Sequence, residues 1–304
     1  MLEHLLAFLV SLSLAAGVQV TGTPAVLPSA TELPSAENKI LLTAPKKLHA
    51  ESMGIGTASP SVFVADVATS QVLYAKRPHD VQSIASLTKL MTAMVILDAQ
   101  LDLDEPITIV KSDLKDELRV IFAEGDVIKR RDLLKALIVG SVNAAGNALA
   151  RSSLGQKEFV AAMNQKARQL NLASPVFVDP VGIDPDNRAS AADVAALMSL
   201  SLSYPEIRKI AAMSSVNIPT AAGEVHTVKS TNLLLNSFLN DGSFNIVGAK
   251  TGSLPEAGYC MAQVTSDKTG HEVVVVSLGG PDHFSRFQDV KALTAWVFDN
   301  FAWQ

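Results

Sequence analysis

The chain has little cysteine, no histidine pair with the spacing of a zinc peptidase, and no excess of basic over acidic residues. Cys260 is the single cysteine among 304 residues, which excludes an internal disulfide and a multi-thiolate zinc site. The only His-Glu pair, His271-Glu272, is followed by Val275 where the helix of a zinc peptidase would carry its second histidine. The chain has 25 basic and 30 acidic residues, so it lacks the basic footprint of a nucleic-acid-binding protein. We therefore expect neither a zinc hydrolase nor a nucleic-acid partner.

Charge is also absent from Leu5 to Val20, an apolar run shorter than the ~20 residues of a membrane span. This length is typical of a signal-peptide core, and Ser13-Leu14-Ala15 offers small residues to a signal peptidase, although no Lys or Arg precedes the run. From Thr21 to Thr57 the composition shifts to Pro, Ala, Ser and Thr. We expect export, with three parts along the chain: a signal peptide or uncleaved N-terminal anchor over 1–20, a disordered spacer over 21–56 and a folded domain over 57–304.

The folded part has ample material for a core, because 48% of all residues are apolar. Residues 61–67 and 72–75 are rich in β-branched side chains on either side of a turn, which predicts a β-hairpin. Leu87, Leu90, Met91, Met94 and Val95 fall on one side of a helix that runs from about 86 to 99.

The rest of the domain alternates between helical and strand patterns. We predict helices over 131–150 (interrupted at Gly140-Ser141), 156–170, 191–202 and 289–301, and strands over 245–251, 258–266 and 272–278. Strands at both ends of the domain predict an α+β fold, in which N- and C-terminal strands share one antiparallel sheet and a helical block packs against it. The functional cleft should lie between the sheet and the helices.

A serine and a lysine stand three residues apart at the start of the first helix. Ser86 and Lys89 therefore project from one side of one turn. A serine hydroxyl is a weak nucleophile without an adjacent base, and a lysine can be that base when burial or nearby cations lower its pKa. Ser112 and Lys115 show the same spacing, but their stretch is highly charged, which predicts a solvated surface turn.

Two further groups of polar residues follow. Ser141 and Asn143 supply a hydroxyl and an amide at the break between two helical patterns, where such residues are also common helix caps. Lys250-Thr251-Gly252 ends a strand; its cation and hydroxyl suit a terminal carboxylate, while the glycine leaves the backbone accessible. Lys268-Thr269-Gly270 repeats this triplet between two strands, which predicts a hairpin turn.

The order of the three groups resembles the signature of class A β-lactamases and penicillin-binding proteins. The likeness extends over residues 57–304 and includes 83–93, 143–150, Asp179-Pro180-Val181-Gly182 with Asn187, and 248–260. The chain thus resembles the low-molecular-mass penicillin-binding proteins. These are the D-alanyl-D-alanine carboxypeptidases and endopeptidases of bacterial cell walls, serine DD-peptidases with a β-lactamase-like fold.

This resemblance implies a serine-type D-alanyl-D-alanine carboxypeptidase that acts through an acyl-enzyme on peptidoglycan stem peptides ending in D-Ala-D-Ala. Ser86 would attack the carbonyl, Lys89 would take and return the proton, and Ser141 would relay a proton to the leaving amine. The implied location is periplasmic or extracytoplasmic, in association with the cell wall. β-Lactams would be covalent inhibitors, and neither a metal nor a cofactor would be required.

The substrate-binding residues are likewise implied by the resemblance. Asn143 would hold a substrate amide, and Lys250 and Thr251 would hold the terminal carboxylate beside Gly252. The oxyanion would lie between the backbone N–H groups of Ser86 and Ser253. We further expect a lowered pKa for Lys89 and a buried strand position for Cys260.

Three alternatives stay open. Ser230-Thr231-Asn232 stands where carboxypeptidases of the family have Asn-Arg-Asn, and its central threonine resembles the endopeptidase-like branch, so a D,D-endopeptidase that cleaves peptidoglycan cross-links is the first. A class A β-lactamase is the second, but it needs a deacylating glutamate in the loop that corresponds to 177–188, which contains none. An inactive wall-binding protein of the same fold is the third.

Overall fold

A computed structural model describes residues 43–115 and 120–303 of the chain. The predicted signal peptide, and the predicted spacer up to residue 42, lie outside these residues. The strands are β1 (Lys46–Lys47), β2 (Ser61–Asp66), β3 (Val72–Lys76), β4 (Gln82–Ser83), β5 (Pro106–Thr108), β6 (Val127–Lys129), β7 (Arg188–Ala189), β8 (Ser215–Pro219), β9 (Val225–Lys229), β10 (Phe244–Leu254), β11 (Gly258–Asp267), β12 (Glu272–Gly280) and β13 (Phe301–Ala302). The helices are α1 (Lys89–Asp98), α2 (Arg130–Val139), α3 (Asn143–Ser153), α4 (Gln156–Gln169), α5 (Ala191–Ser201), α6 (Pro205–Ile210) and α7 (Ser285–Asn300).

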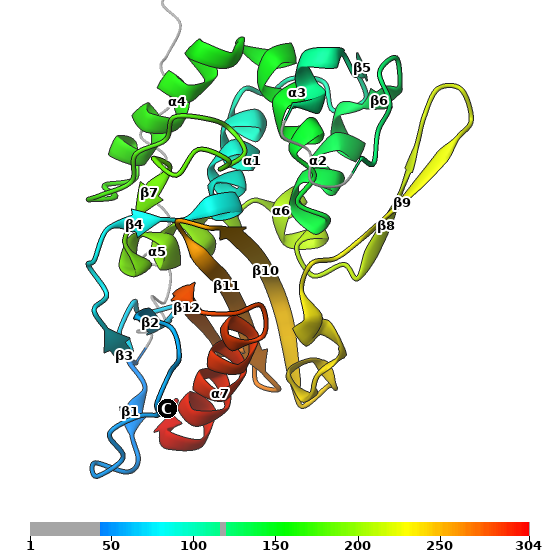
Figure 1. Ribbon diagram of the computed structural model, residues 1–304. Helices are drawn as coiled ribbons and strands as arrows, with labels where there is room; N and C mark the ends of the chain where they lie inside the picture. Colours follow the sequence, from blue (N-terminus) through cyan, green and yellow to red (C-terminus); the bar gives the residue numbers. More distant parts are fainter. Residues whose placement is uncertain (1–42, 116–119, 304) are drawn as a thin grey trace, which may run out of the picture. The chain divides into compact units, whose positions relative to one another are not determined.

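The main sheet has five antiparallel strands in the order β10-β11-β12-β2-β3 (Figure 1). The N-terminal hairpin β2–β3 joins the three C-terminal strands through the pairing of β12 with β2, in which Val275 lies opposite Val64. The predicted α+β fold, with terminal strands in one antiparallel sheet, is therefore confirmed. Strand β10 forms one edge of the sheet, so one side of its backbone is free to face a ligand.

The sheet is covered on both faces. Successive side chains of a strand point to opposite faces, and in β12 Val273 and Val275 join one hydrophobic cluster while Val274 and Val276 join another. The first cluster contains the apolar side of α7, and the second contains the helical block (Figure 1). A strand buried on both faces reads as a continuous apolar run, which is why residues 273–276 are all valine.

The helical block matches the predicted pattern closely, with differences at helix ends. Helix α2 ends at Val139 and α3 begins at Asn143, so the break predicted at Gly140-Ser141 is confirmed. The predicted helix from Ser86 opens instead with a 3₁₀ turn over Ala85–Thr88, and α1 begins at Lys89. The closing helix begins at Ser285, four residues before its predicted start at 289.

Some elements have no counterpart in the sequence predictions. Strands β8 and β9 form a hairpin that projects from the helical side, and α6 precedes it (Figure 1). Strand β1 pairs with β13, so residues 46–47 of the predicted spacer already belong to the folded unit, ahead of the boundary placed at residue 57. Within the described ranges, no helix is long and apolar enough to span a membrane.

Candidate active site

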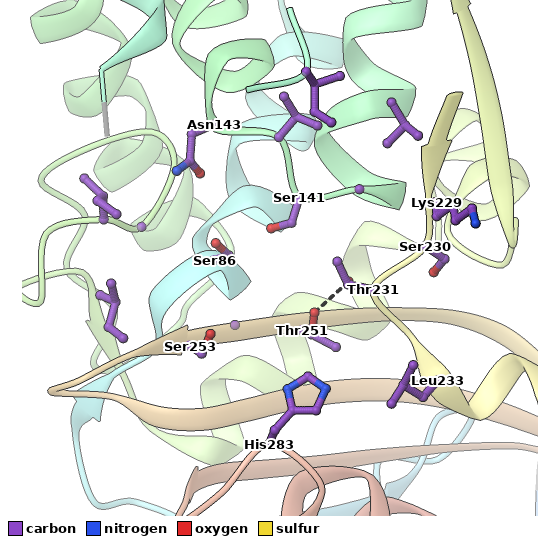
Figure 2. A pocket seen from close by; sticks show the side chains of 18 of the residues that line it. Ser86, Ser141, Asn143, Lys229, Ser230, Thr231, Leu233, Thr251, Ser253 and His283 are labelled. Carbon is purple, nitrogen blue, oxygen red and sulfur yellow. Dashed lines mark hydrogen bonds between the residues drawn. The ribbon is translucent and has the colours of Figure 1, made fainter. Parts of the chain in front are cut away.

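A cleft of about 380 Å³ opens between the edge strand β10 and the helical block. Figure 2 shows Ser86, Ser141 and Asn143 on the helical side and Thr251 and Ser253 on the strand side. The β9 end and the loop that follows it form a third wall with Lys229, Ser230 and Thr231. The cleft thus lies between sheet and helices, where the sequence analysis placed it.

The pair Ser86 and Lys89 is connected by a hydrogen bond at the base of this cleft. Nζ of Lys89 lies 2.8 Å from Oγ of Ser86, because the 3₁₀ turn and the first turn of α1 bring positions three apart onto one side. The Lys89 side chain is fully buried, and Nζ also donates to Oδ1 of Asn143 (2.7 Å) and to the carbonyl of Val181 (2.5 Å). The lysine therefore has three oxygen neighbours and no exposure to water.

The carbonyl of Val181 is held in place by a rigid loop. The Asp179 carboxylate accepts hydrogen bonds from the backbone N–H groups of 181–184 and from the side chain of Asn187. Gly182 of this loop has φ +74°, and a Cβ at that position would lie 2.0 Å from the carbonyl oxygen of Ala85. The glycine lets the loop pack directly against the turn that carries Ser86.

Ser141 is aimed at the cleft by unusual backbone geometry. It has φ +58°, in the left-handed region that costs a non-glycine residue about 1–2 kcal/mol, and it occupies the break between α2 and α3. Its Oγ accepts a hydrogen bond from Nζ of Lys250 at 2.8 Å. Asn143, the first residue of α3, meets Lys89 from the same junction. The break between α2 and α3 thus brings Ser141 to Lys250 and Asn143 to Lys89.

Strand β10 supplies the opposite wall. Lys250 is buried and bridges Ser141 to its own strand through the carbonyl of Thr251 (2.9 Å). Oγ1 of Thr251 lies 2.7 Å from Oγ1 of Thr231 on the third wall. A Cβ at Gly252 would lie 2.9 Å from the carbonyl oxygen of Ile84 and 3.0 Å from the amide nitrogen of Ser86, so this glycine permits the strand to pass beside the serine.

All eight residues singled out from the sequence therefore meet at one cleft. Ser86, Ser141, Asn143, Thr251, Gly252 and Ser253 line it, and the two lysines lie buried behind Ser86 and Ser141. The repeated motifs lie elsewhere: Ser112 and Lys115 are exposed near Asp113, and Lys268-Thr269-Gly270 forms the turn between β11 and β12. Cys260 is buried in β11 as predicted, and its burial raises the pKa of the thiol to about 11.

The charge of Lys250 makes the stability of the fold depend on pH. The pKa of this ammonium lies well below its usual value of 10.5, because the side chain is buried and because Lys89 and Arg286 carry like charge nearby. Between the lowered pKa and 10.5, the unfolded chain holds a proton that the folded chain has released. The free energy of unfolding should therefore rise with pH in this window by up to about 1.4 kcal/mol per pH unit.

This pH dependence can be measured by urea unfolding of the wild type and of Lys250→Met. The rise in the free energy of unfolding is complete above pH 10.5, and this stability is lost as the pH falls through the lowered pKa of Lys250. The variant lacks this amine. Its free energy of unfolding should therefore rise less steeply with pH than that of the wild type, by up to about 1.4 kcal/mol per pH unit, which corresponds to one proton. Equal slopes over the alkaline range would contradict a lowered pKa for Lys250.

His283 and Arg286 are among the cleft-lining residues that the sequence analysis missed. Arg286 is buried on α7 and donates to the carbonyl of Gly252 at 2.9 Å. A signal for it exists, because Arg286 shares the buried side of α7 with Val290, Leu293 and Val297 at helical spacing. A charged side chain on an apolar helix face requires a hydrogen-bond partner, and here the partner is the backbone of β10 at Gly252.

One group of described residues has the composition of a metal site. Ligand atoms of Asp126, Glu224 and His226 lie within 4.8 Å of one another, where the β8–β9 hairpin meets the segment before β6. None of the three lines the cleft.

Comparisons with known proteins agree with this geometry. The sequence profile of a family described as D-alanyl-D-alanine carboxypeptidase matches residues 47–282. A protein named D-alanyl-D-alanine endopeptidase from Pseudomonas aeruginosa is 35% identical over 245 residues, which are 79% of this chain and 77% of that protein. A protein of the same name from Escherichia coli is 33% identical over 246 residues, with the same two shares.

A solved structure with a similar fold is that of the DD-transpeptidase of Streptomyces K15. The two chains superpose with a TM-score of 0.74 at 27% sequence identity, over 81% of this chain and 99% of that one. The similarity spans the sheet, the helical block and the cleft between them, because the matched share covers nearly all of the described residues.

Proposed function

This chain belongs to the D-alanyl-D-alanine carboxypeptidase family of serine peptidases, and from that membership we propose that it hydrolyses D-alanyl peptide bonds in peptidoglycan, with cross-links between stem peptides as preferred substrates. One observation carries the chemistry: a buried lysine lies 2.8 Å from a serine hydroxyl in a cleft whose other wall holds Lys250 and Thr251. We propose an extracytoplasmic location, since the substrate is the cell wall.

In this proposal Ser86 is the nucleophile and Lys89 is its base. Lys89 acts as the base in its uncharged form, whereas its charged form lowers the pKa of Lys250; the uncharged amine has two N–H groups and one lone pair. The carbonyl of Val181 and Oδ1 of Asn143 suit the two N–H groups, which leaves the lone pair directed at the Ser86 hydroxyl. Ser86 then adds to the D-alanine carbonyl, and Lys89 takes the hydroxyl proton.

The remaining residues act on the tetrahedral intermediate. The backbone N–H groups of Ser86 and Ser253 would bind the oxyanion, and loss of one such donor costs about 3 kcal/mol. Ser141, hydrogen-bonded to Lys250, would relay the proton held by Lys89 to the leaving amine, after which the C–N bond breaks and the acyl-enzyme remains. Water then adds to the ester carbonyl while Lys89 takes one of its protons; the bond between the acyl carbon and Oγ of Ser86 breaks, Lys89 returns the proton to Oγ, and the new carboxylate leaves.

Thr231 supports the preference for cross-links. In a cross-link the leaving amine belongs to a second stem peptide, so the leaving-group side of the cleft must admit an extended chain. Thr231 lies on that side and is tied to Thr251 by its hydroxyl at 2.7 Å, so its short side chain does not extend across the cleft. Removal of a terminal D-alanine is the second candidate, favoured by the family's description.

The test of this proposal is incubation of the purified chain with two muropeptides, a cross-linked dimer and an uncross-linked pentapeptide. Cleavage of the dimer to monomers with the higher kcat/KM supports the preference. Release of free D-alanine alone would support the carboxypeptidase reading instead. Failure to cleave either substrate, together with no labelling by a fluorescent penicillin, would overturn the peptidase assignment for this chain.

Replacement of Thr231 by arginine should shift this balance. The longer cationic side chain cannot reproduce the hydroxyl contact with Thr251 and would occupy space on the leaving-group side. We expect the kcat/KM ratio of dimer to pentapeptide to fall by about tenfold, since pocket shape commonly discriminates substrates by such factors. Thr231→Ser, which keeps the hydroxyl, is the control and should leave the ratio close to that of the wild type.

A further inference from the structure

His283 forms part of the cleft wall on the side of the sheet. It lies between the end of β12 and the start of α7, and it lines the cleft together with Thr251 and Ser253. Figure 2 shows its imidazole directed toward the strand that carries these two residues. The side chain is exposed, so a ligand in the cleft can reach it. None of the roles described above uses this residue.

The neighbour of His283 fixes which ring nitrogen carries the proton. Nη2 of Arg286 lies 3.1 Å from Nδ1 of His283. A guanidinium has only donors, so Nδ1 must accept this hydrogen bond. The neutral ring then carries its proton on Nε2, at the opposite side of the ring from the buried arginine. His283 is therefore a hydrogen-bond donor to the cleft.

The orientation of the ring is set by its packing. Tyr259 and Phe287 contact the imidazole edge-on, with centroid distances of 5.9 and 5.5 Å. Arg286 is itself fixed over these two aromatic rings and by its hydrogen bond to the carbonyl of Gly252. A donor held in this way loses little side-chain entropy when it binds a ligand.

The charges around His283 favour an anionic ligand. Arg286 is a buried cation, and its charge is one of the causes that lower the pKa of the buried Lys250. Burial and the charge of Arg286 hold the pKa of His283 below its usual value, although Asp282 opposes this shift. At neutral pH the ring is thus an uncharged donor in a region of positive potential, an arrangement that suits a carboxylate.

We propose that His283 is a specificity-determining residue that donates a hydrogen bond from Nε2 to the free carboxylate of the leaving D-amino acid. This inference rests on the proposed function, because it assigns a contact on the leaving-group side of the same reaction. A terminal D-alanine carries such a carboxylate next to the scissile amide. Arg286 acts through His283 as a positioning residue, since it fixes the tautomer.

The test combines a change in the enzyme with a change in the substrate. His283→Phe keeps an aromatic ring against Tyr259 and Phe287 but has no N–H donor. Against a D-Ala-D-Ala peptide, we expect kcat/KM to fall by about 10- to 100-fold, mainly through KM, because a hydrogen bond to a charged group is lost. Against the same peptide ending in a carboxamide, the fall in kcat/KM for His283→Phe should be clearly smaller, because the amide oxygen accepts only a neutral hydrogen bond from Nε2. His283→Gln, which restores a donor, should recover part of the loss.

Each outcome of this test is decisive. The same loss on both peptides would mean that His283 supports the cleft only structurally, and no loss on the carboxylate peptide would remove it from recognition. Thermal unfolding of His283→Phe and His283→Gln checks that both variants fold. A wild type that neither cleaves the peptide nor reacts with penicillin overturns the proposed function and this inference with it, whereas an active wild type matched by His283→Phe overturns this inference alone.

Discussion

Ser86→Ala should abolish covalent labelling by penicillin and lower peptide hydrolysis by at least about 10³-fold. The variant lacks the oxygen that would form the acyl-enzyme and that lies 2.8 Å from Nζ of Lys89. Stability should change by no more than about 1 kcal/mol, because Lys89 keeps its contacts with Asn143 and Val181. Mass spectrometry of the protein after exposure to penicillin gives the first readout, and muropeptide turnover gives the second.

The chain provides its own control for this experiment. Ser112 has the same spacing to a lysine, Lys115, but both residues are exposed and lie away from the cleft. Ser112→Ala should therefore label and hydrolyse like the wild type. A penicillin adduct on the Ser86→Ala protein would show that another residue is the nucleophile.

Lys89→Met should be nearly as damaging as Ser86→Ala. Methionine has a similar length and no branch, so it can occupy the buried channel without a base at its end. Without the amine the Ser86 hydroxyl keeps the carbonyl of Val181 as an acceptor, which is too weak a base to take its proton, and acylation should fall by at least about 10³-fold. The control is Lys115→Met in the repeated motif, which should leave acylation unchanged.

The double variant tests whether the two residues work as one unit. Groups that act on one step show strongly non-additive effects, so Ser86→Ala with Lys89→Met should be no slower than Ser86→Ala alone. The Lys89→Met variant should also bring the pKa of Lys250 closer to its usual value, since one of the like charges that lower it is gone. An acylation rate for Lys89→Met within tenfold of the wild type would assign the base to another group.

Much of the fold was predictable because its elements have strong local patterns. The long strands β10, β11 and β12 and the helices α2 to α5 follow the hydrophobic periods that identified them. The hairpin of β8 and β9 escaped identification because its strands are short and each buries only one side, as Val216 and Ile218 do in β8. Pairs of two-residue strands such as β1 and β13 have no local pattern, since they form only when distant segments meet.

The contacts of the site also differ in whether the sequence alone predicts them. Ser86 and Lys89 are three residues apart, so local helical geometry alone predicts that their side chains meet. Ser141 and Lys250 are separated by 109 positions, and their hydrogen bond results from the left-handed backbone at Ser141 and the edge position of β10. His283 and Arg286 belong to no motif, and their place in the cleft follows from the packing of α7 on the sheet.

The sequence by itself determined the class of chemistry and the order of the layers, because residue types and periodicities express which side chains can react and which faces must be buried. Tertiary structure alone decided the electrostatics of the cleft. Whether a lysine is buried or solvated depends on the neighbours that displace water, as the contrast between Lys89 and Lys115 shows. Those neighbours, including Val181 and Asn143, come from segments that only folding brings within reach.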